Sequence, residues 1–464
     1  MLPSAGISLL YEESVPTPFL ISFGWTLLAG FLIWIPVRSV KKELRLRDGF
    51  VIVVLFWVVL GIAGAIPLYL SSQLGMSFTD AAFESLSGLT TTGATVITGI
   101  DKLPHSILFY RQQLQWLGGM GIIVLAVAIL PMLGIGGMQL YRAETPGPMK
   151  DAKLTPRITE TAKALWYIYL GLTVACALAY WLVGMDAFDA IAHSFSTVSI
   201  GGFSTHDASI GFFNNPMVEV VAIIFMFIAG INFALHFVAW RNMSFRHYLF
   251  DPEAKAYFFI LLITAIITSG YLYYSGVMGD DFWSALHHGV FQTISIGTTA
   301  GFTTTAHFDW PSFLPVMLIF ISFIGGCAGS TGGGMKVVRF MLLLRQGMRE
   351  ILRLIHPNAQ ISIKVGGKTM SPRIVESVWG FFAAYVASFS LMLLILMMTG
   401  LDQVTAFSAV AACMNNLGPG LGDVGANYKD INDVAKWVLS FAMLLGRLEI
   451  FTLLVILTPH FWRR

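Results

Sequence analysis

Four short glycine-containing stretches recur along the 464-residue chain and are the residues best suited to chemistry. They read LTTTGA (89–94), VSIGGF (198–203), GTTAGF (297–302) and MNNLGP (414–419), and the aligned glycines are 109, 99 and 117 residues apart. Glycine adopts positive φ without strain, so it can turn successive backbone carbonyls toward one axis. Rings of such carbonyls replace the water ligands of a permeant cation. The candidate ion-binding residues are Thr91, Thr92, Gly93, Ile200, Gly201, Gly202, Thr299, Ala300, Gly301, Asn416, Leu417 and Gly418.

None of the four stretches contains a carboxylate. Filters for divalent cations generally use rings of Asp or Glu, so the pattern favours a monovalent cation. Glycine in membrane helices also serves simply to let helices pack closely. Four copies in register, each behind a short apolar segment, favour the pore interpretation over close packing.

A second glycine-rich segment interrupts the apolar run at 312–356. Residues 325–334 read GGCAGSTGGG, and six glycines in ten residues do not sustain a helix at about 1 kcal/mol each relative to alanine. Irregular backbone at membrane depth is tolerated where it is buried in protein or lines water. The sequence therefore predicts either a loop able to block a pore or a packing kink. The candidate gate residues are Gly329, Ser330, Thr331, Gly332, Gly333, Gly334 and Arg447.

Arg447 stands in the apolar run 434–459, which predicts one long helix. A charge at that depth costs several kcal/mol unless it meets a polar cavity or a partner. We expect Arg447 to face the pore below the glycine stretches, near Ser330–Gly334. The alternative is a structural tie to Glu449 or to a loop carbonyl.

The elements that position these residues follow from composition. Hydrophobic residues make up 56% of the chain and charged residues 12%, with a mean hydropathy of +0.73 and a net charge of +2. Such a chain requires a bilayer. Long apolar runs lie near 17–37, 50–70, 114–134, 164–184, 216–240, 256–276, 312–328, 334–356, 374–399 and 434–459, and shorter ones near 78–90, 186–199, 282–298 and 402–415.

The predicted fold is an all-α polytopic membrane protein with four helix–pore-loop–helix pseudo-repeats around one ion pore and an extra N-terminal helix. Its predicted parts are an N-terminal helix and linker (1–47), repeat 1 (48–141), repeat 2 (142–240), repeat 3 with the Gly-rich loop (241–356) and repeat 4 (357–464). Lys and Arg gather in segments 38–47, 142–163, 241–255 and 336–373 and at the C-terminus, so the positive-inside rule makes these cytoplasmic. Asp residues on the other side would raise the local cation concentration, or are ordinary loop acids.

The chain resembles the Trk-type potassium uptake transmembrane subunits of the Trk/Ktr/HKT superfamily. The resemblance rests on the four stretches, on Tyr110–Gly121 (YRQQLQWLGGMG) and on Gly446–Thr452 (GRLEIFT), and covers about residues 45–464. It implies potassium uptake across the bacterial inner membrane, a homodimer with one pore per subunit, and a cytosolic TrkA-like nucleotide-binding regulatory subunit. It also implies that residues 325–334 form an intramembrane gating loop. Glycine at all four filter positions, including Gly93, goes with potassium selectivity in this superfamily.

Other functional classes are less well supported. Residues 329–336 imitate a phosphate-binding loop but lack its Ser or Thr, and no histidine is spaced to make Ser330 a nucleophile, so we expect no enzyme. We expect no bound cofactor other than the permeant potassium ion, and no nucleic-acid partner. His287 and His288 are interpreted as packing or hydrogen-bonding residues rather than a metal site. A symporter that couples potassium to protons or sodium remains the alternative, with Glu84, Glu449 and the histidines as candidate titratable groups.

Overall fold

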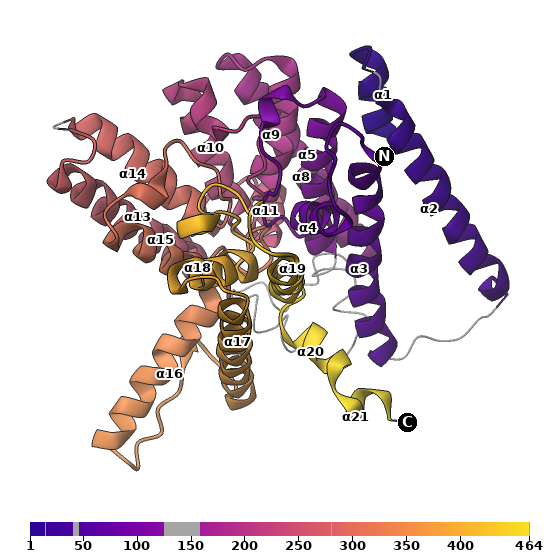
Figure 1. Cartoon of the computed structure of the whole chain (residues 1–464). Helices are drawn as coiled ribbons and strands as arrows, with labels where there is room; N and C mark the ends of the chain where they lie inside the picture. Colours follow the sequence, from indigo (N-terminus) through magenta and orange to yellow (C-terminus); the bar gives the residue numbers. More distant parts are fainter. Residues whose placement is uncertain (14, 40–45, 125–157, 280, 464) are drawn as a thin grey trace.

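The chain folds as an α-helical, multi-pass membrane protein (Figure 1). The computed structural model describes residues 1–13, 15–39, 46–124, 158–279 and 281–463. The only strands among these residues are the two-residue β1 (Lys364–Val365) and β2 (Lys368–Thr369), which pair antiparallel. The predicted boundary between repeats 1 and 2, the predicted span beyond residue 124 and the basic segment 142–157 lie outside the described residues.

Four copies of the same helical order follow an N-terminal pair of helices, α1 (Leu2–Leu10) and α2 (Pro16–Val37). Copy 1 has α3 (Leu46–Leu70), α4 (Phe78–Leu89) and α5 (His105–Val124), and copy 2 has α8 (Ile158–Leu182), α9 (Ala187–Ser199), α10 (Pro216–Ala229) and α11 (Phe233–Arg241). Copy 3 has α13 (Pro252–Ser275), α14 (Phe282–Gly297), α15 (Phe313–Ile324) and α16 (Val337–Ile355), and copy 4 has α17 (Pro372–Met398), α18 (Gln403–Met414), α19 (Asp433–Arg447) and α20 (Phe451–Leu457).

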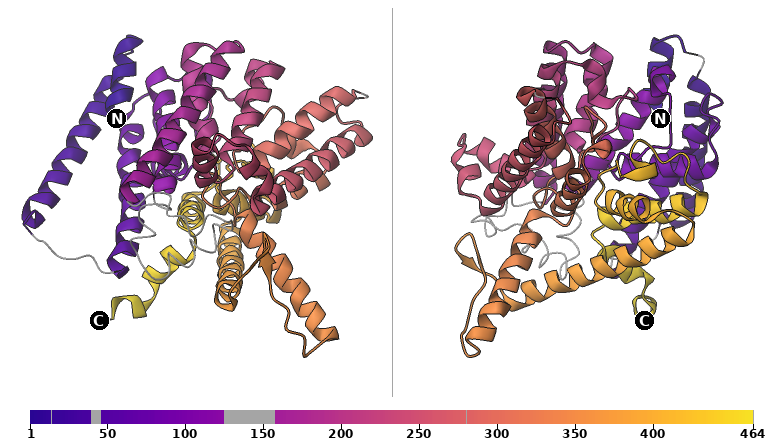
Figure 2. Two further views of the ribbon diagram at one scale, coloured as in Figure 1. Left: turned by 180° about the vertical axis from the view of Figure 1, so that it is seen from behind. Right: turned by 60° about the vertical axis from the view of Figure 1, so that its left-hand side comes forward.

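Short helices complete the chain. These are α12 (Arg246–Phe250), α21 (Pro459–Trp462) and the 3₁₀ helices η1 (Ile100–Lys102), η3 (Ser209–Phe213), η4 (His307–Asp309) and η5 (Gly422–Val424). Helix α2 stands at one edge of the molecule, and α16 and α17 project from one end of it together with the C-terminus (Figures 1 and 2).

Five helices in the described part of the chain are long and apolar enough to cross a membrane. They cover Pro16–Val37, Arg47–Leu70, Ala162–Leu182, Pro252–Ser275 and Pro372–Met398. Two further helix pairs pass the same test together but are bent, α10 with α11 by 93° and α19 with α20 by 118°. The continuous helices predicted over 216–240 and 434–459 are therefore wrong. Asn232 begins a new helix by accepting a hydrogen bond from Ala234 N, and Glu449 and Ile450 both adopt positive φ (55° and 26°).

The four short apolar segments are helices, as predicted, and they form the centre of the molecule. Most residues of α4, α9, α14 and α18 are buried. Each of the four begins with a side-chain cap that accepts a backbone N–H at the helix N-terminus. The capping residues are Ser77, Asp186, Asp281 and Asp402. Asp186, Asp281 and Asp402 are thus helix caps. This agrees with their interpretation as ordinary loop acids rather than as groups that attract cations.

Candidate functional site

The four short helices end in the same backbone structure, which places the glycine stretches alike. One or two residues after each helix, the backbone adopts positive φ at Thr91 (54°), Ile200 (55°), Thr299 (71°) and Asn416 (54°). The next residue donates its N–H to the carbonyl five positions back, in the pairs Thr92–Ser87 (2.9 Å), Gly201–Ser196 (2.8 Å), Ala300–Ser295 (2.7 Å) and Leu417–Ala412 (2.7 Å). This is the Schellman ending, which normally uses glycine at the left-handed position. Three β-branched residues there are unusual, and such strain gathers at functional sites.

The four stretches meet in a closed ring. Gly93, Gly202, Gly301 and Gly418 all adopt positive φ, between 79° and 98°. A Cβ added to any of them would lie less than 3.0 Å from a carbonyl oxygen of another stretch, in the cyclic pairs Gly93–Gly201, Gly202–Ala300, Gly301–Leu417 and Gly418–Thr92. Each carbonyl belongs to the residue just before the neighbouring stretch's glycine. Residues more than 300 positions apart in sequence therefore close one ring. Each ring position favours glycine twice, because its φ is positive and because a Cβ would collide with a carbonyl oxygen.

Side chains from neighbouring helices hold the ring. Gln115 of α5 donates from Nε2 to Gly201 O at 2.5 Å and accepts from Phe203 N at 3.1 Å. Asn416 donates from Nδ2 to Thr92 Oγ1 and to Met443 O, both at 3.0 Å. These contacts join copies 1 and 2 and copies 4 and 1. The ring is thus fixed by side chains as well as by the four helix endings.

A large cavity opens on one side of the ring. It has a volume of about 350 Å³, and its lining includes all four ring glycines and the loops around His206 and Thr304. His206 hydrogen-bonds to Asp101 Oδ1 at 2.6 Å and to Asp189 Oδ2 at 3.0 Å. Burial lowers the pKa of His206, but the hydrogen bonds to Asp189 and Asp101 outweigh this and raise it above the usual 6.5. Among the described residues, Asp207 is the one acidic residue that lines this cavity, and Arg111 and His206 line it as well.

The Gly-rich loop lies against the other side of the ring. Gly333 N donates to Thr299 Oγ1 at 2.6 Å, and Gly334 N donates to Asn415 O at 3.0 Å. Thr331 Oγ1 donates to Val198 O at 3.0 Å. The loop thus contacts the ends of three of the four short helices. A cavity of about 20 Å³, room for about one water, remains between the loop, Asn416 and Arg447.

The broken ends of α10 and α19 meet the same loop. Gly230 O accepts from Cys327 N at 2.9 Å, and Gly329 O accepts from Phe233 N at 3.0 Å. Arg447 is the last residue of α19 and is 1% exposed, so the prediction that it lies within a long helix is wrong. A basic residue is favourable at a helix C-terminus. Its guanidinium donates from Nη1 to Thr331 O (3.1 Å) and from Nη2 to Gly118 O (3.0 Å).

Comparison with known proteins identifies the architecture. The family model described as "TrkH: Cation transport protein" matches residues 17–463. The chain belongs to the TrkH family. It is similar to the crystal structure of the potassium transporter TrkH from Vibrio parahaemolyticus, with a TM-score of 0.92 and 55% identity over 100% of this chain and 96% of that one.

Sequence relatives agree with this membership. The Trk system potassium uptake protein TrkH of Vibrio parahaemolyticus is 58% identical over 467 residues, covering 100% of this chain and 96% of that protein. The TrkH of Escherichia coli K12 is 54% identical over 457 residues (98% and 94%). The Trk system protein TrkG of Escherichia coli K12 is 43% identical over 463 residues (100% and 95%).

Within this TrkH-family fold, a buried ion pair braces the ring. Arg111 Nε lies 2.8 Å from Glu84 Oε1, and both side chains are at most 1% exposed. Arg111 also donates to Ser204 O (3.1 Å), and Glu84 accepts from Val96 N (2.9 Å). The pair therefore joins α4 and α5 to the chain leaving two glycine stretches. Sequence reasoning considered each residue alone and missed the pair, since 27 positions separate them along the chain.

A second buried carboxylate holds the Gly-rich loop. Glu253, in the first turn of α13, is 2% exposed and accepts hydrogen bonds from Ala328 N (2.7 Å) and Val338 N (3.2 Å). It thus ties the loop at Ala328 and the start of α16 at Val338 to α13. In the sequence, Glu253 follows Pro252 at the start of a helix. An acidic residue there is expected only to stabilise the helix N-terminus, so its contact with the loop was not predictable.

Glu449 is paired outside its own helix. Its Oε2 lies 2.9 Å from Arg339 Nη2 of α16, so Glu449 is tied to the helix that follows the loop. Arg447, which the sequence offered as a partner for Glu449, instead donates to the loop carbonyl of Thr331. A loop carbonyl was the other tie that the sequence left open for that arginine.

Proposed function

We propose that this chain conducts potassium across a bacterial inner membrane through the ring of four glycine stretches. The ion would be held by backbone oxygens at Thr91–Gly93, Ile200–Gly202, Thr299–Gly301 and Asn416–Gly418. No other cofactor is required. The names of the relatives, potassium uptake proteins and a potassium transporter, support potassium as the substrate.

The closed ring is the observation that carries this proposal. Four carbonyls, one before each glycine, lie against the glycine of the neighbouring stretch. Such a ring presents oxygen dipoles and no carboxylate, the chemistry that suits a dehydrated monovalent cation. The large cavity reaches all four ring glycines and would give a cation access to the ring.

The filter should be less regular than a fourfold one. The four residues at the left-handed positions make different contacts: Thr299 Oγ1 accepts a loop N–H, Asn416 donates to Thr92, and Ile200 has an apolar side chain. Among the described residues, none hydrogen-bonds to the buried Thr91 Oγ1. That hydroxyl oxygen is therefore available to coordinate the permeant ion.

Residues Gly329–Gly334 would gate this pore, with Arg447 as an electrostatic barrier below the filter. The loop occupies the space beneath the ring and leaves only the small cavity. A buried guanidinium beside the ion path would oppose cation passage, by about 2 kcal/mol for unit charges 8 Å apart at an effective dielectric constant near 20. Conduction then requires the loop, and with it Arg447, to move aside.

The remaining assignments rest on the family and on charge distribution. The positive-inside rule applied to the basic segments supports a cytoplasmic side for α16 and the C-terminus, with the large cavity outside. A homodimer in membrane lipid and a cytosolic TrkA-like nucleotide-binding partner belong to the proposal. The Trk system named for the relatives supports a transporter that works with other components.

A channel mechanism is favoured over symport. Ion-coupled transport needs a titratable group that is free to exchange a proton at membrane depth. Both carboxylates singled out from the sequence have cationic partners, Glu84 in Arg111 and Glu449 in Arg339. They are better placed to hold structure than to shuttle protons.

Flux measurements on purified protein in liposomes test this proposal. We expect potassium to follow its own electrochemical gradient at any imposed pH or sodium gradient. Uphill potassium movement driven by either gradient would establish a symporter instead. Because the loop fills the space under the ring, the assay should include a loop-loosening variant such as Glu253→Gln, which weakens the tether while leaving the ring residues unchanged.

A further inference from the structure

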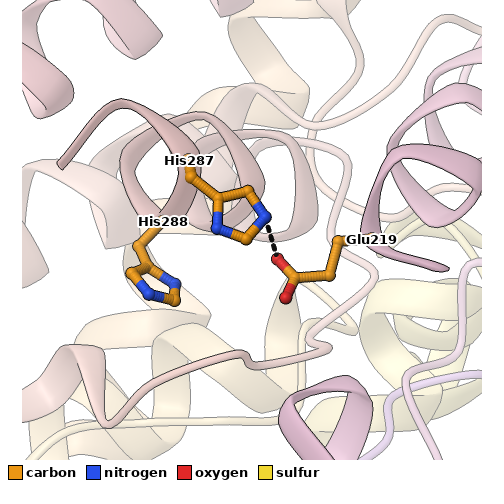
Figure 3. Close-up of side chains that lie close together, drawn as sticks. All are labelled: Glu219, His287 and His288. Atoms are coloured by element: carbon orange, nitrogen blue, oxygen red, sulfur yellow. Dashed lines mark ion pairs between the residues drawn. The ribbon is translucent and has the colours of Figure 1, made fainter. Parts of the chain in front are cut away.

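Outside the pore, Glu219 of α10 meets two neighbouring histidines of α14, His287 and His288 (Figure 3). Their potential ligand atoms all lie within 4.8 Å of one another. This is the one group of three such side chains found in the described ranges of the chain. The two helices belong to different copies, so the sequence alone does not indicate that these residues meet.

The surroundings of the buried Glu219 carboxylate favour a bound cation. Its side chain is 5% exposed, and Oε2 lies 2.7 Å from His287 Nε2. Neither atom makes a hydrogen bond of acceptable geometry to any described residue. A buried carboxylate without a well-formed partner is costly. A carboxylate oxygen and an unprotonated imidazole nitrogen are both metal ligands, so a metal ion can take the place of a proton between them.

His288 is already oriented for the same ligand. Its Nδ1 lies 3.0 Å from Thr304 Oγ1, which leaves Nε2 as its other coordinating atom. Metal-ligating histidines typically use one ring nitrogen for the metal and the other for such a supporting hydrogen bond. His287 is 28% exposed at its side chain, so an ion can reach the group from the surface.

We propose that Glu219, His287 and His288 form a binding site for a divalent transition metal of the zinc class. Two imidazoles and one carboxylate are a ligand set that zinc accepts, whereas calcium and magnesium prefer oxygen ligands alone. Ligands on one tetrahedral zinc ion lie roughly 3.3 Å apart, so Glu219 and His287, at 2.7 Å, must separate slightly and the wider spacings within the group must shorten. Three protein ligands leave a position for water.

The ion would join copies 2 and 3 beside the large cavity. Helix α14 leads into Thr299–Gly301, and Thr304 both contacts His288 and lines the cavity. The proposal is independent of which cation passes the ring. It therefore stands or fails separately from the proposed function.

Zinc binding by the purified full-length chain tests the site. A titration against a competing fluorescent chelator should give one Zn²⁺ per chain. His287→Ala, His288→Ala and Glu219→Gln should each weaken binding at least about tenfold. The matched control His105→Ala removes a histidine that is 45% exposed at its side chain and lies outside the group, and it should bind as the original chain does.

Two measurements on the unaltered chain guard against variants that fail to fold. Zn²⁺ should raise the melting temperature of the chain, because an ion that binds only the folded state stabilises it. It should also protect His287 and His288, and not His105, from modification by diethyl pyrocarbonate, read by mass spectrometry. Absence of stoichiometric zinc, unchanged affinity in Glu219→Gln, or equal modification of all three histidines would overturn the proposal.

Discussion

The ring of glycine stretches and the Gly-rich loop lie in contact, yet they use glycine differently. In the ring, all four glycines have positive φ and each meets a carbonyl of another stretch. In the loop, Gly325, Gly329 and Gly334 have positive φ, while Gly326, Gly332 and Gly333 have ordinary φ and need glycine only because a Cβ would meet neighbouring atoms. The ring needs glycine to close, whereas the loop needs it mainly to bring bare backbone under the ring.

The two regions also differ in what holds them. The ring is built on four local helix endings with the same hydrogen bonds, backed by Gln115 and by the Arg111–Glu84 pair. The loop depends on contacts to distant segments, among them Glu253, Thr299 and Arg447. Local bonds repeated four times make a rigid frame, whereas the loop can move once its hydrogen bonds to other segments break. This difference suits a fixed filter above a movable gate.

The largest effect should come from breaking the brace of the ring. Glu84→Gln leaves Arg111 as a buried charge without its partner, and we expect a loss of about 3–5 kcal/mol in the free energy of unfolding. Thermal unfolding in detergent would measure it. The control Glu350→Gln disrupts an exposed pair with Arg353 and should cost less than about 1 kcal/mol. Equal shifts for the two variants would contradict a bracing role.

A slightly smaller effect should separate steric closure of the ring from backbone strain. Gly202→Ala adds left-handed strain of about 1–2 kcal/mol and overpacking of about 1–3 kcal/mol against Ala300 O. Gly99 has a similar φ of 72°, but a Cβ there would meet open space. Gly99→Ala should therefore lose stability through backbone strain alone. Unfolding of the two variants under identical conditions measures the difference. A Gly99 variant as damaged as the Gly202 variant would mean that the ring is not closed by contact.

A third substitution tests the role of Arg447, which contacts the Gly-rich loop. Arg447→Gln removes a charge that repels a cation by about 2 kcal/mol, so basal potassium flux should rise by about thirtyfold. Arg447→Lys keeps the charge but loses the two-pronged contact to Thr331 and Gly118. Flux that rises equally in both variants would assign Arg447 to tying the loop rather than to repelling cations. Liposome flux at fixed protein content measures both.

The smallest expected effect is a pH dependence at the wall of the large cavity. The pKa of His206 is raised in the folded chain, so its contribution to stability is full below the unfolded value near 6.5 and is lost as pH rises through the higher folded value. The melting temperature of the original chain should therefore fall over that window relative to His206→Gln. Parallel melting curves for the two proteins at all pH values would contradict the role of Asp101 and Asp189 as partners.

Much of the frame could be predicted from residue spacing. The short segments expected near 78–90, 186–199, 282–298 and 402–415 are the helices α4, α9, α14 and α18. Apolar runs of 12 to 17 residues followed by a polar glycine stretch carry that signal locally. The position of each glycine also follows, because positive φ and close approach both select for the residue without a side chain.

The rest depended on tertiary contacts that spacing does not encode. The breaks after α10 and α19 involve Asn232, Glu449 and Ile450, none of which is a helix breaker of the strength of proline. Hydropathy indicates only continuous apolar runs there. The partner of Arg111, the contact of Arg447 with Gly118 and the meeting of Glu219 with His287 join helices whose relative placement was not predictable from one sequence.

The central claim is that a closed, rigid ring of backbone carbonyls selects the permeant ion. Its most direct test is the potassium-to-sodium flux ratio of Gly93→Ser in liposomes, compared with the original chain and with Gly99→Ser. A Cβ added at Gly93 would lie less than 3.0 Å from Gly201 O, so the substitution should force the ring open. We predict a marked rise in sodium flux for the Gly93 variant alone. An unchanged ratio in a folded Gly93→Ser protein would contradict the assignment of the ring as the selectivity filter.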